Sequence, residues 1–449
     1  MLYKIFKVLF YLTTKAYFRS ISVQGSETIP DSGKPIIFAA NHPSSFMDPI
    51  LIAVILKRPV YFLARGDIFK NKIIRKLFNT FHMIPIFTAD LSPDQLHKNE
   101  STFEKCYDHL ANDNTLLIFP EGSSKTERRL RPIKTGTARI ALGAEEKNDF
   151  KLGLSIVPIG INYSDPHYFN NDVFVNISKP VSIAEYKNEF EKDPRNAVVQ
   201  LTQKLKEELE TSIVIIEDER LEKIINQVEL FYRSTLRDDN KLEEKAVQDF
   251  ELSQDIVKAV EFFTQHEPKK VKDFKLKITQ YLAELERLDL RDTQIRSSSV
   301  SKNLIGKILY FIFGFPIFIF GFVTCLIPFK LSGFISDKII IREDFVGAIK
   351  IAVGLLVFTF LFAIESTLIG MYTDTLWGIL FFIALYPAGA FTLAYITNYY
   401  KFRGSIKYLN LFMRKSDVVA NMKVMRKELI NELEARKEEF IISQEEIIN

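Results

Sequence analysis

The sequence contains few of the residues that build disulfide-rich or metal-bound proteins. Only two of its 449 residues are cysteines, Cys106 and Cys325, and they lie far apart in the chain. A disulfide framework or a thiolate metal site is therefore not expected. The six histidines show no metal-ligand spacing. With 59 basic and 56 acidic residues the net charge is only +3, which argues against a nucleic-acid-binding protein.

Common signatures of nucleophilic and nucleotide-dependent catalysis are missing too. The chain has no Gly-x-Ser-x-Gly sequence, so a covalent serine enzyme is not expected. It has no glycine-rich phosphate loop, so nucleotide hydrolysis is not suggested. Cys106 lies in a helical pattern, where packing is a more common role than nucleophilic attack. We expect neither a metal nor an organic cofactor.

Three long runs of the chain are almost free of charge. Leu304–Phe329 contains one charged residue, Val346–Ile369 contains two and Thr375–Thr397 contains none. Each run reaches the length of about 20 apolar residues that a membrane-spanning helix needs. A single run could be the buried helix of a soluble protein, but three together predict an integral membrane protein with a membrane region over 301–400.

The distribution of basic residues predicts the orientation of this region. The loop Met371–Asp374 has no lysine or arginine, whereas basic residues gather before the second run and after the last, at Lys330, Lys338, Arg342, Lys401, Arg403, Lys407, Arg414 and Lys415. The positive-inside rule places these basic segments, including a charged C-terminal helix over 401–449, in the cytoplasm. For a cytoplasmic catalytic domain, Leu304–Phe329 would then re-enter at Pro316 or lie in the interface.

The first residues of the chain carry a different membrane signal. Residues 1–20 are rich in leucine, phenylalanine and tyrosine, and their charges are all basic, at Lys4, Lys7, Lys15 and Arg19. Since Lys7, Lys15 and Arg19 would share one helical face, a basic interfacial helix fits this segment. A cleaved signal peptide is the alternative, but Lys7 interrupts the apolar core and no small-x-small cleavage site follows.

Residues 21–182 alternate between strand and helix patterns, which is typical of an α/β domain with a mixed sheet flanked by helices. Strands are expected at Pro35–Ala40, Val60–Ala64, Met83–Phe87, Thr115–Phe119, Ile156–Ile161 and Val173–Ile177, with helices at 47–57, 70–80, 93–112 and 134–146. Ser92-Pro93-Asp94 is a good helix start. Residues 183–300 read as charged amphipathic helices that end in a linker at Ser297–Ser299.

The segment Asn41-His42-Pro43-Ser44-Ser45-Phe46-Met47-Asp48 follows the first of these strands. On a regular helix, residues six apart point in different directions, so His42 and Asp48 meet only if the chain turns first. Pro43 disfavours a helical conformation at His42 and permits such a turn. Asp48 would then accept a hydrogen bond from Nδ1 and leave Nε2 as a general base.

A second loop is expected at the same edge of the sheet. The strand Thr115–Phe119 leads into Pro120-Glu121-Gly122-Ser123-Ser124, where Glu121 could bind an acceptor hydroxyl and Gly122 allows close backbone approach. A basic cluster follows at Arg128, Arg129, Arg131 and Lys134. This cluster suits a phosphate, or it is simply a solvated loop. The strand Val157–Asn162 is a candidate wall of an acyl pocket.

Together these segments carry a family resemblance. Asn-His-Pro-Ser-Ser-Phe-Met-Asp-Pro, Ile-Phe-Pro-Glu-Gly-Ser-Ser, Leu-Arg-Pro-Ile-Lys-Thr-Gly and Val-Pro-Ile-Gly follow one another at suitable intervals. In this order they resemble the glycerolipid acyltransferases, the PlsC-like family that includes glycerol-3-phosphate and 1-acylglycerol-3-phosphate acyltransferases. The resemblance covers roughly residues 20–182 and implies an O-acyltransferase of phospholipid synthesis that works with membrane lipids.

The resemblance also implies roles for individual residues. His42 would be the general base and Asp48 would orient it, so that the acceptor alkoxide attacks the thioester of acyl-CoA or acyl carrier protein directly. Glu121, Gly122 and Ser123 would belong to the acceptor-binding loop. Acylation of another lysophospholipid or of dihydroxyacetone phosphate is an alternative, as is a membrane lipid-binding protein that has lost catalysis.

Two departures from the family pattern bear on the acceptor. Five residues separate His42 from Asp48, one more than is common, which resembles a branch that includes fungal-type glycerol-3-phosphate acyltransferases. An arginine that the family uses to hold the acceptor phosphate is replaced by Thr88. The phosphate is therefore expected on Arg65 or on the cluster that contains Arg128, Arg131 and Lys134.

Overall fold

The computed structural model describes residues 2–30, 33–69, 71–87, 94, 97, 99–235, 242–296, 304–340 and 342–448. The chain forms two compact units. The first comprises Met1–Ile215 and Gly333–Leu355, and the second comprises Ile216–Ser332 and Leu356–Asn449. The expected helix start at Ser92-Pro93 and the linker Ser297–Ser299 lie outside the described residues.

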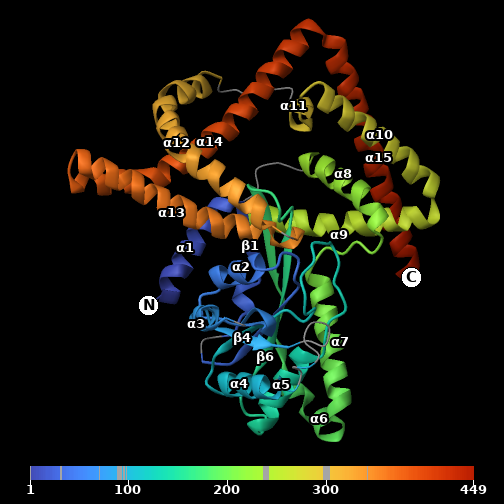
Figure 1. Ribbon diagram of the computed structural model, residues 1–449. Helices are drawn as coiled ribbons and strands as arrows, with labels where there is room; N and C mark the ends of the chain where they lie inside the picture. Colours follow the sequence, from blue (N-terminus) through green and yellow to red (C-terminus); the bar gives the residue numbers. More distant parts are fainter. Residues whose placement is uncertain are drawn as a thin grey trace. The chain divides into compact units, whose positions relative to one another are not determined.

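The first unit is built on a mixed sheet, as the sequence predicts (Figure 1). The strand order is β1-β7-β6-β2-β5-β3-β4, with β8 added beside β6. β7 runs antiparallel to β6, β8 also pairs antiparallel with β6, and the other pairs are parallel. The strands are β1 (Phe18–Gln24), β2 (Ile36–Ala40), β3 (Tyr61–Arg65), β4 (Met83–Ile86), β5 (Thr115–Ile118), β6 (Ser155–Tyr163), β7 (Asn171–Ile177) and β8 (Val181–Ser182).

The central strands β2 and β5 are buried along their whole length, because helices cover both faces of the sheet. Alternate residues of β2 therefore enter two different cores. Ile36 and Phe38 pack with α1 (Leu2–Tyr17) and α2 (Met47–Ile55). Ile37 and Ala39 pack on the opposite face with α4 (Asn99–Ala111), α5 (Gly136–Lys147) and α7 (Pro194–Ser212).

The amino-terminal segment differs from the expected basic interfacial helix. Helix α1 ends at Tyr17, and the chain continues as β1, which pairs with β7 at the edge of the sheet. Arg19 therefore lies on a strand and forms an ion pair with Asp172. Lys7 donates to the Leu56 carbonyl (2.6 Å). The shared basic face is absent because Arg19 has left the helix and Lys7 faces protein.

The boundary expected at residue 182 also moves. Helix α7 begins at Pro194 and is capped by Asp193, whose side chain accepts hydrogen bonds from two backbone N–H groups of the first turn. Its apolar stripe, including Leu201, Leu205 and Leu209, is buried in the core beneath the sheet. The α/β unit therefore continues to Ile215, and only the later helices of 183–300 belong to the second unit.

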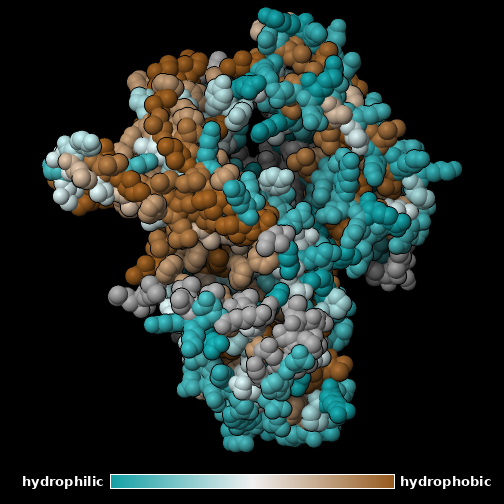
Figure 2. Space-filling model, in the orientation of Figure 1, coloured by the Kyte–Doolittle hydropathy of each residue, from teal (hydrophilic) through white to brown (hydrophobic). Residues whose placement is uncertain are grey.

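Among the described residues, three helices are long and apolar enough to cross a membrane, judged by length and composition. They are α12 (Leu304–Ile339), α13 (Val346–Tyr372) and α14 (Thr375–Arg414). Large apolar side chains such as Phe313 and Met371 are mostly exposed on them, and Figure 2 shows apolar surface gathered over this part of the chain. Helix α12 is continuous through Pro316, where we expected the chain to re-enter.

Small residues bring these helices together within the second unit. A Cβ on Gly321 of α12 would stand 2.5 Å from the Ala388 carbonyl oxygen of α14, and one on Gly378 would stand 3.1 Å from Gly370 Cα of α13. Backbones approach this closely only where side chains are absent. Such small-residue contacts are how helices pack inside membranes, where apolar burial alone gives no preference for protein over lipid.

The rest of the second unit is helical (Figure 1). They are α8 (Glu219–Thr235), α9 (Leu242–His266), α10 (Pro268–Arg287), α11 (Asp292–Arg296) and α15 (Ser416–Ile448). Arg426 of α15 reaches Asp292 of α11 (Nε–Oδ1, 2.9 Å), and Tyr281 of α10 donates to the same carboxylate (2.5 Å). The C-terminal helix is therefore packed within this unit, and α14 extends beyond the expected boundary at residue 401.

Candidate active site

His42 lies in the turn between β2 and α2, and Asp48 lies in the first turn of α2. The chain leaves β2 at Ala40 and turns through Ser45, which has a left-handed backbone (φ 41°). The Met47 N–H then donates to the Ser44 carbonyl (2.8 Å) as α2 begins. This turn brings His42 Nδ1 to 2.7 Å from Asp48 Oδ2, as expected if the chain bends before the helix.

The buried Asp48 carboxylate has two further hydrogen-bond donors. The Ser44 N–H donates to the same oxygen, Oδ2, as His42 (2.8 Å), and the Tyr163 hydroxyl at the end of β6 donates to Oδ1 (2.8 Å). Because the Ser44 N–H can only donate, Oδ2 acts as an acceptor, and the neutral His42 tautomer that fits this contact has its proton on Nδ1 and its acceptor at Nε2. Burial and the neighbouring Asp48 raise the pKa of Tyr163 well above its ordinary value, so its hydroxyl stays protonated.

The backbone and ring of His42 are held by the loop that follows β5. The His42 N–H donates to Glu121 Oε1 (2.7 Å), and the imidazole stacks on Phe119 with ring centroids 3.9 Å apart. Only 17% of the His42 side chain is exposed. Asn41 fixes the other side of the turn, because its amide exchanges two hydrogen bonds with the Ile161 backbone (3.1 and 2.7 Å).

Glu121 links His42 to Arg131. Arg131 donates from Nε to Glu121 Oε2 (2.9 Å) and from Nη1 to Ser123 Oγ (2.9 Å). Among the described residues, the buried Nη2 of Arg131 has no hydrogen-bond partner. Burial raises the pKa of Glu121, and the His42 N–H and Arg131 act in the opposite direction. Gly122 has φ 75°, a backbone conformation that glycine tolerates best.

The structure brings only some of the expected phosphate ligands to this loop. The Lys134 side chain lies against Gly122, 3.1 Å from where a Cβ would stand. Arg128 belongs to the same loop and is partly buried. Arg65 ends β3 at the same edge of the sheet, with β5 between β3 and β2. Thr88, which stands where the family has arginine, lies outside the described residues.

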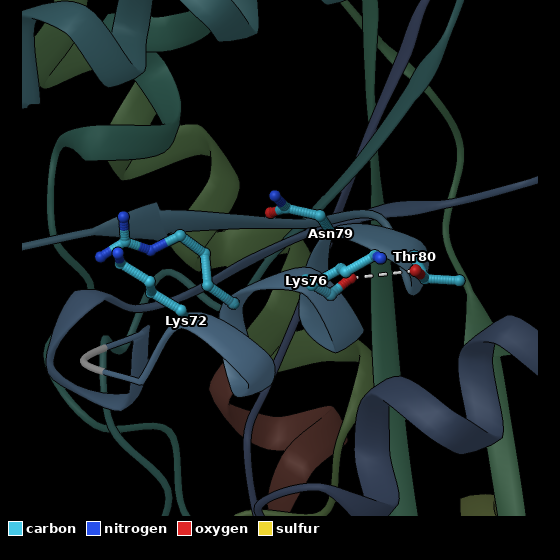
Figure 3. A pocket seen from close by; sticks show the side chains of 5 residues that line it. Lys72, Lys76, Asn79 and Thr80 are labelled. Carbon is cyan, nitrogen blue, oxygen red and sulfur yellow. Dashed lines mark hydrogen bonds between the residues drawn. The ribbon is translucent and has the colours of Figure 1, made fainter.

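A separate basic hollow lies along α3 (Lys72–Thr80). It has a volume of about 420 Å³ and is lined by Lys72, Arg75, Lys76, Asn79 and Thr80. Figure 3 shows these side chains projecting from the single helix, with the Thr80 hydroxyl bonded back to the Lys76 carbonyl (2.9 Å). Arg75 donates to the Phe69 carbonyl (3.2 Å). None of the lining residues is a site residue named above, so we interpret the hollow as a solvated basic face.

Comparison with known proteins assigns most of the sheet and both site loops to a protein family. Residues 20–162 match the model of the Acyltransferase family. This segment is an acyltransferase domain. The match contains both the His42–Asp48 turn and the Glu121 loop, and it stops one residue before Tyr163.

Relatives of the acyltransferase domain include proteins named as glycerol-3-phosphate O-acyltransferases and others named as 1-acyl-sn-glycerol-3-phosphate acyltransferases. "Glycerol-3-phosphate O-acyltransferase 1" of Saccharomyces cerevisiae is 24% identical over 68% of this chain and 51% of its own length. "Glycerol-3-phosphate O-acyltransferase 2" of the same yeast is 32% identical over 24% of this chain and 14% of its own. The chloroplastic "1-acyl-sn-glycerol-3-phosphate acyltransferase BAT2" of Brassica napus is 26% identical over 36% and 46%. The chain spans about half the length of the first of these relatives.

A solved structure also resembles part of the chain. It is the 1-acyl-sn-glycerophosphate (LPA) acyltransferase PlsC of Thermotoga maritima, with 21% identity and a TM-score of 0.33. The similarity covers 46% of this chain and 79% of the other.

Two residues of the site were not found from the sequence. Tyr163 lies 115 residues from Asp48 in the chain, two positions beyond the expected strand Ile156–Ile161, so only the sheet order brings them together. Asn41 stands beside His42 in the motif, yet its role as a clamp on β6 depends on the pairing of β2 with β6. The motif itself was the available signal for Asn41, whereas Tyr163 had none.

Proposed function

We propose that the chain transfers an acyl group from a thioester donor, acyl-CoA or acyl carrier protein, to a hydroxyl of glycerol 3-phosphate or 1-acylglycerol 3-phosphate. The observation that carries this proposal is the hydrogen-bonded pair of His42 and the buried Asp48 in an acyltransferase domain. The pair leaves Nε2 of His42 as a base. A transferred acyl chain and a lipid product also suit a chain with three helices that are long and apolar enough to cross a membrane.

The proposed mechanism is direct transfer without a covalent enzyme intermediate. His42 Nε2 takes the proton of the acceptor hydroxyl while the oxygen attacks the thioester carbonyl carbon. The new C–O bond forms, the C–S bond breaks, and the thiolate leaves with the proton that His42 carries. Asp48 stabilises the transient imidazolium through the Nδ1–H bond. Ser44 and Tyr163 hold the Asp48 carboxylate in place for this task.

Glycerol 3-phosphate is the acceptor that we favour. The yeast relative with that name matches 68% of this chain, whereas the chloroplastic relatives named for 1-acyl-sn-glycerol-3-phosphate match about a third of it. The unpartnered Nη2 of Arg131 supports a phosphate ligand at the Glu121 loop, because a phosphate oxygen that entered the loop would accept a hydrogen bond from it. Lys134 beside Gly122 would add a second positive charge.

The proposed location is the cytoplasmic face of a membrane, with membrane lipids as partners. The basic residues that flank the apolar helices support this orientation through the positive-inside rule. The turn that joins α12 to α13 contacts the Glu121 loop inside the first unit. The acyltransferase site would then face the cytoplasm, and the turn that contacts its Glu121 loop would connect two membrane helices directly.

The test is the rate of acyl transfer by purified full-length protein in lipid nanodiscs. Palmitoyl-CoA would be supplied as donor against glycerol 3-phosphate, 1-acylglycerol 3-phosphate, a lysophospholipid and dihydroxyacetone phosphate in turn. We expect transfer to glycerol 3-phosphate and a loss of at least about 10³-fold in His42→Ala. The matched control is His266→Ala, an exposed histidine of α9, which should keep full activity.

Each other result has a defined meaning. Transfer to 1-acylglycerol 3-phosphate alone would reassign the acceptor while keeping the reaction. Transfer to the lysophospholipid or to dihydroxyacetone phosphate alone would favour the alternative acyltransferases. Full activity in His42→Ala would overturn the mechanism. Activity on no acceptor, with either palmitoyl-CoA or palmitoyl-acyl carrier protein, would favour a lipid-binding protein without catalysis.

A further inference from the structure

The turn between α12 and α13 reaches the active-site loop with a buried carboxylate. Asp344 is only 4% exposed. Its carboxylate accepts a hydrogen bond from the Ser124 hydroxyl. It also accepts two hydrogen bonds from the Arg342 guanidinium, one from Nε to Oδ1 (3.0 Å) and one from Nη2 to Oδ2 (2.9 Å). All three residues belong to the first compact unit, although Ser124 and Asp344 are 220 positions apart in the chain.

Ser124 is held at two points by this turn. Its hydroxyl binds Asp344, and its carbonyl accepts a hydrogen bond from Arg342 Nη2 (3.1 Å). The neighbouring Phe345 packs edge-on against Phe46 of the His42–Asp48 turn, with centroids 5.6 Å apart. The Arg342 guanidinium lies 5.2 Å from the Phe345 ring centroid. One short turn therefore touches both loops that form the site.

The contact of Asp344 with Ser124 and Arg342 favours one geometry of the loop, because it depends on directional hydrogen bonds to a buried charge. A buried carboxylate is costly unless it is paired and hydrogen-bonded, so Asp344 stabilises the arrangement in which Ser124 and Arg342 both reach it. Ser124 follows Ser123, whose hydroxyl accepts from Arg131, and lies three residues after Glu121, which binds the His42 backbone. Fixing Ser124 therefore limits movement of the segment that links His42 to Arg131.

We propose that Asp344 is a positioning residue of the acyltransferase site. Through Ser124 it holds the Glu121 loop in the geometry that receives the polar part of the acceptor, and the turn between two apolar helices becomes part of the wall of the site. The inference rests on the proposed function for its kinetic consequence. The structural consequence, an ordered loop at 121–128, does not depend on which substrate is used.

The kinetic test compares Ser124→Ala, Asp344→Ala and the double variant in the full-length protein. Each single variant should lower kcat/KM for glycerol 3-phosphate by about tenfold, the size of one lost charge-assisted hydrogen bond. The loss should appear mainly in KM for the acceptor, with KM for palmitoyl-CoA unchanged. The double variant should be no worse than Asp344→Ala alone, because the two side chains act as a pair. Glu343→Gln is the matched control, an exposed carboxylate in the same turn.

The second test is hydrogen exchange, which needs no activity. Asp344→Ala should raise exchange in residues 121–128 while Glu343→Gln leaves it unchanged, and the melting temperature should report whether either variant is unfolded. If the wild-type protein transfers no acyl group but this loop loosens as expected, the proposed function fails and the positioning contact stands. Additive kinetic losses in the double variant, equal effects on both substrates, or an unchanged loop would overturn the inference. If Asp344→Ala does not fold, Ser124→Ala is tested alone by the same two readouts.

Discussion

Replacing Asp48 by asparagine tests how the site fixes the proton of His42. The change turns one carboxylate oxygen into an amide NH₂ group and removes the negative charge. If the NH₂ group faced His42, it would force Nδ1 to accept and would place the proton on Nε2. His42 would then be unable to act as a base at Nε2, a tautomer error that costs a rate factor on the order of 10⁴.

The structure predicts the other orientation of the amide. The Oδ2 position of Asp48 faces two donors, His42 Nδ1–H and the Ser44 backbone N–H, and a backbone N–H cannot become an acceptor. The Oδ1 position faces the Tyr163 hydroxyl, which can accept as well as donate. The amide oxygen should therefore stay toward Ser44 and His42, and the NH₂ group should donate to Tyr163. All three hydrogen bonds survive, and the working tautomer of His42 is kept.

In the proposed mechanism, Asp48→Asn loses the charge that stabilises the His42 imidazolium. Hydrogen bonds to charged groups are worth about 1.5–3 kcal/mol and neutral ones about 1 kcal/mol. For the bond to His42 this difference is about 0.5–2 kcal/mol, which corresponds to a fall in kcat/KM of roughly 2- to 30-fold. The measurement is kcat/KM for glycerol 3-phosphate at matched amounts of folded protein. A loss near 10⁴-fold would show that Ser44 does not orient the amide, and an unchanged rate would show that Asp48 has no part in catalysis.

Three further predictions concern residues around the site and the core. Tyr163→Phe removes one donor to Asp48, and kcat/KM should fall about fivefold; because the pKa of Tyr163 is raised by burial and by Asp48, this factor should be the same at pH 6 and pH 9. Leu205→Ala leaves a cavity in the core under α7, where Leu205 is 1% exposed, and should lower the free energy of unfolding by about 3 kcal/mol in thermal or urea melts. The control is Val199→Ala on the same helix, where the side chain is 59% exposed, and it should change the free energy of unfolding by less than about 0.5 kcal/mol. Burial, with a smaller effect of His82, lowers the pKa of His109 to about 4. Between about pH 6.5 and 4 the unfolded chain therefore binds more protons than the folded one, and the stability of the fold should decrease as the pH is lowered through that window. His109→Phe should make the melting temperature depend less on pH there, and an unchanged dependence would contradict the assignment.

The strands and helices of the sheet were predictable because their signals are local. The apolar runs at Ile36–Ala40 and Thr115–Ile118 are the fully buried strands β2 and β5, within one residue of the expected ends. The strand β1 was missed because the basic residues of 1–20 read as one helix. Its position depends on pairing with β7, about 150 residues later in the chain, and on the ion pair between Arg19 and Asp172. Local patterns contain no information on such pairing.

The same distinction separates the parts of the site. His42 and Asp48 were predictable as a pair because both lie on one short segment, and Pro43 permits the turn that they need in order to meet. Glu121 was expected to contact the acceptor, and the structure adds a different role, since both of its oxygens accept hydrogen bonds from the protein, from His42 N–H and Arg131 Nε. That role follows from the parallel neighbours β2 and β5, whose carboxyl ends meet at one edge.

The contacts that support the His42–Asp48 turn and the Glu121 loop therefore extend beyond the segment that matches the Acyltransferase family. The match ends at residue 162, yet Tyr163 supports Asp48, α7 closes the core to residue 212, and Asp344 holds Ser124. A piece cut after residue 182 would expose the apolar face of the sheet that Leu205 covers, and it would leave Ser124 without its carboxylate. Even a soluble version of the α/β unit that kept α7 would lack the turn at Asp344. If that turn positions the acceptor loop, removing the membrane helices should impair acceptor binding even where the His42–Asp48 pair is intact.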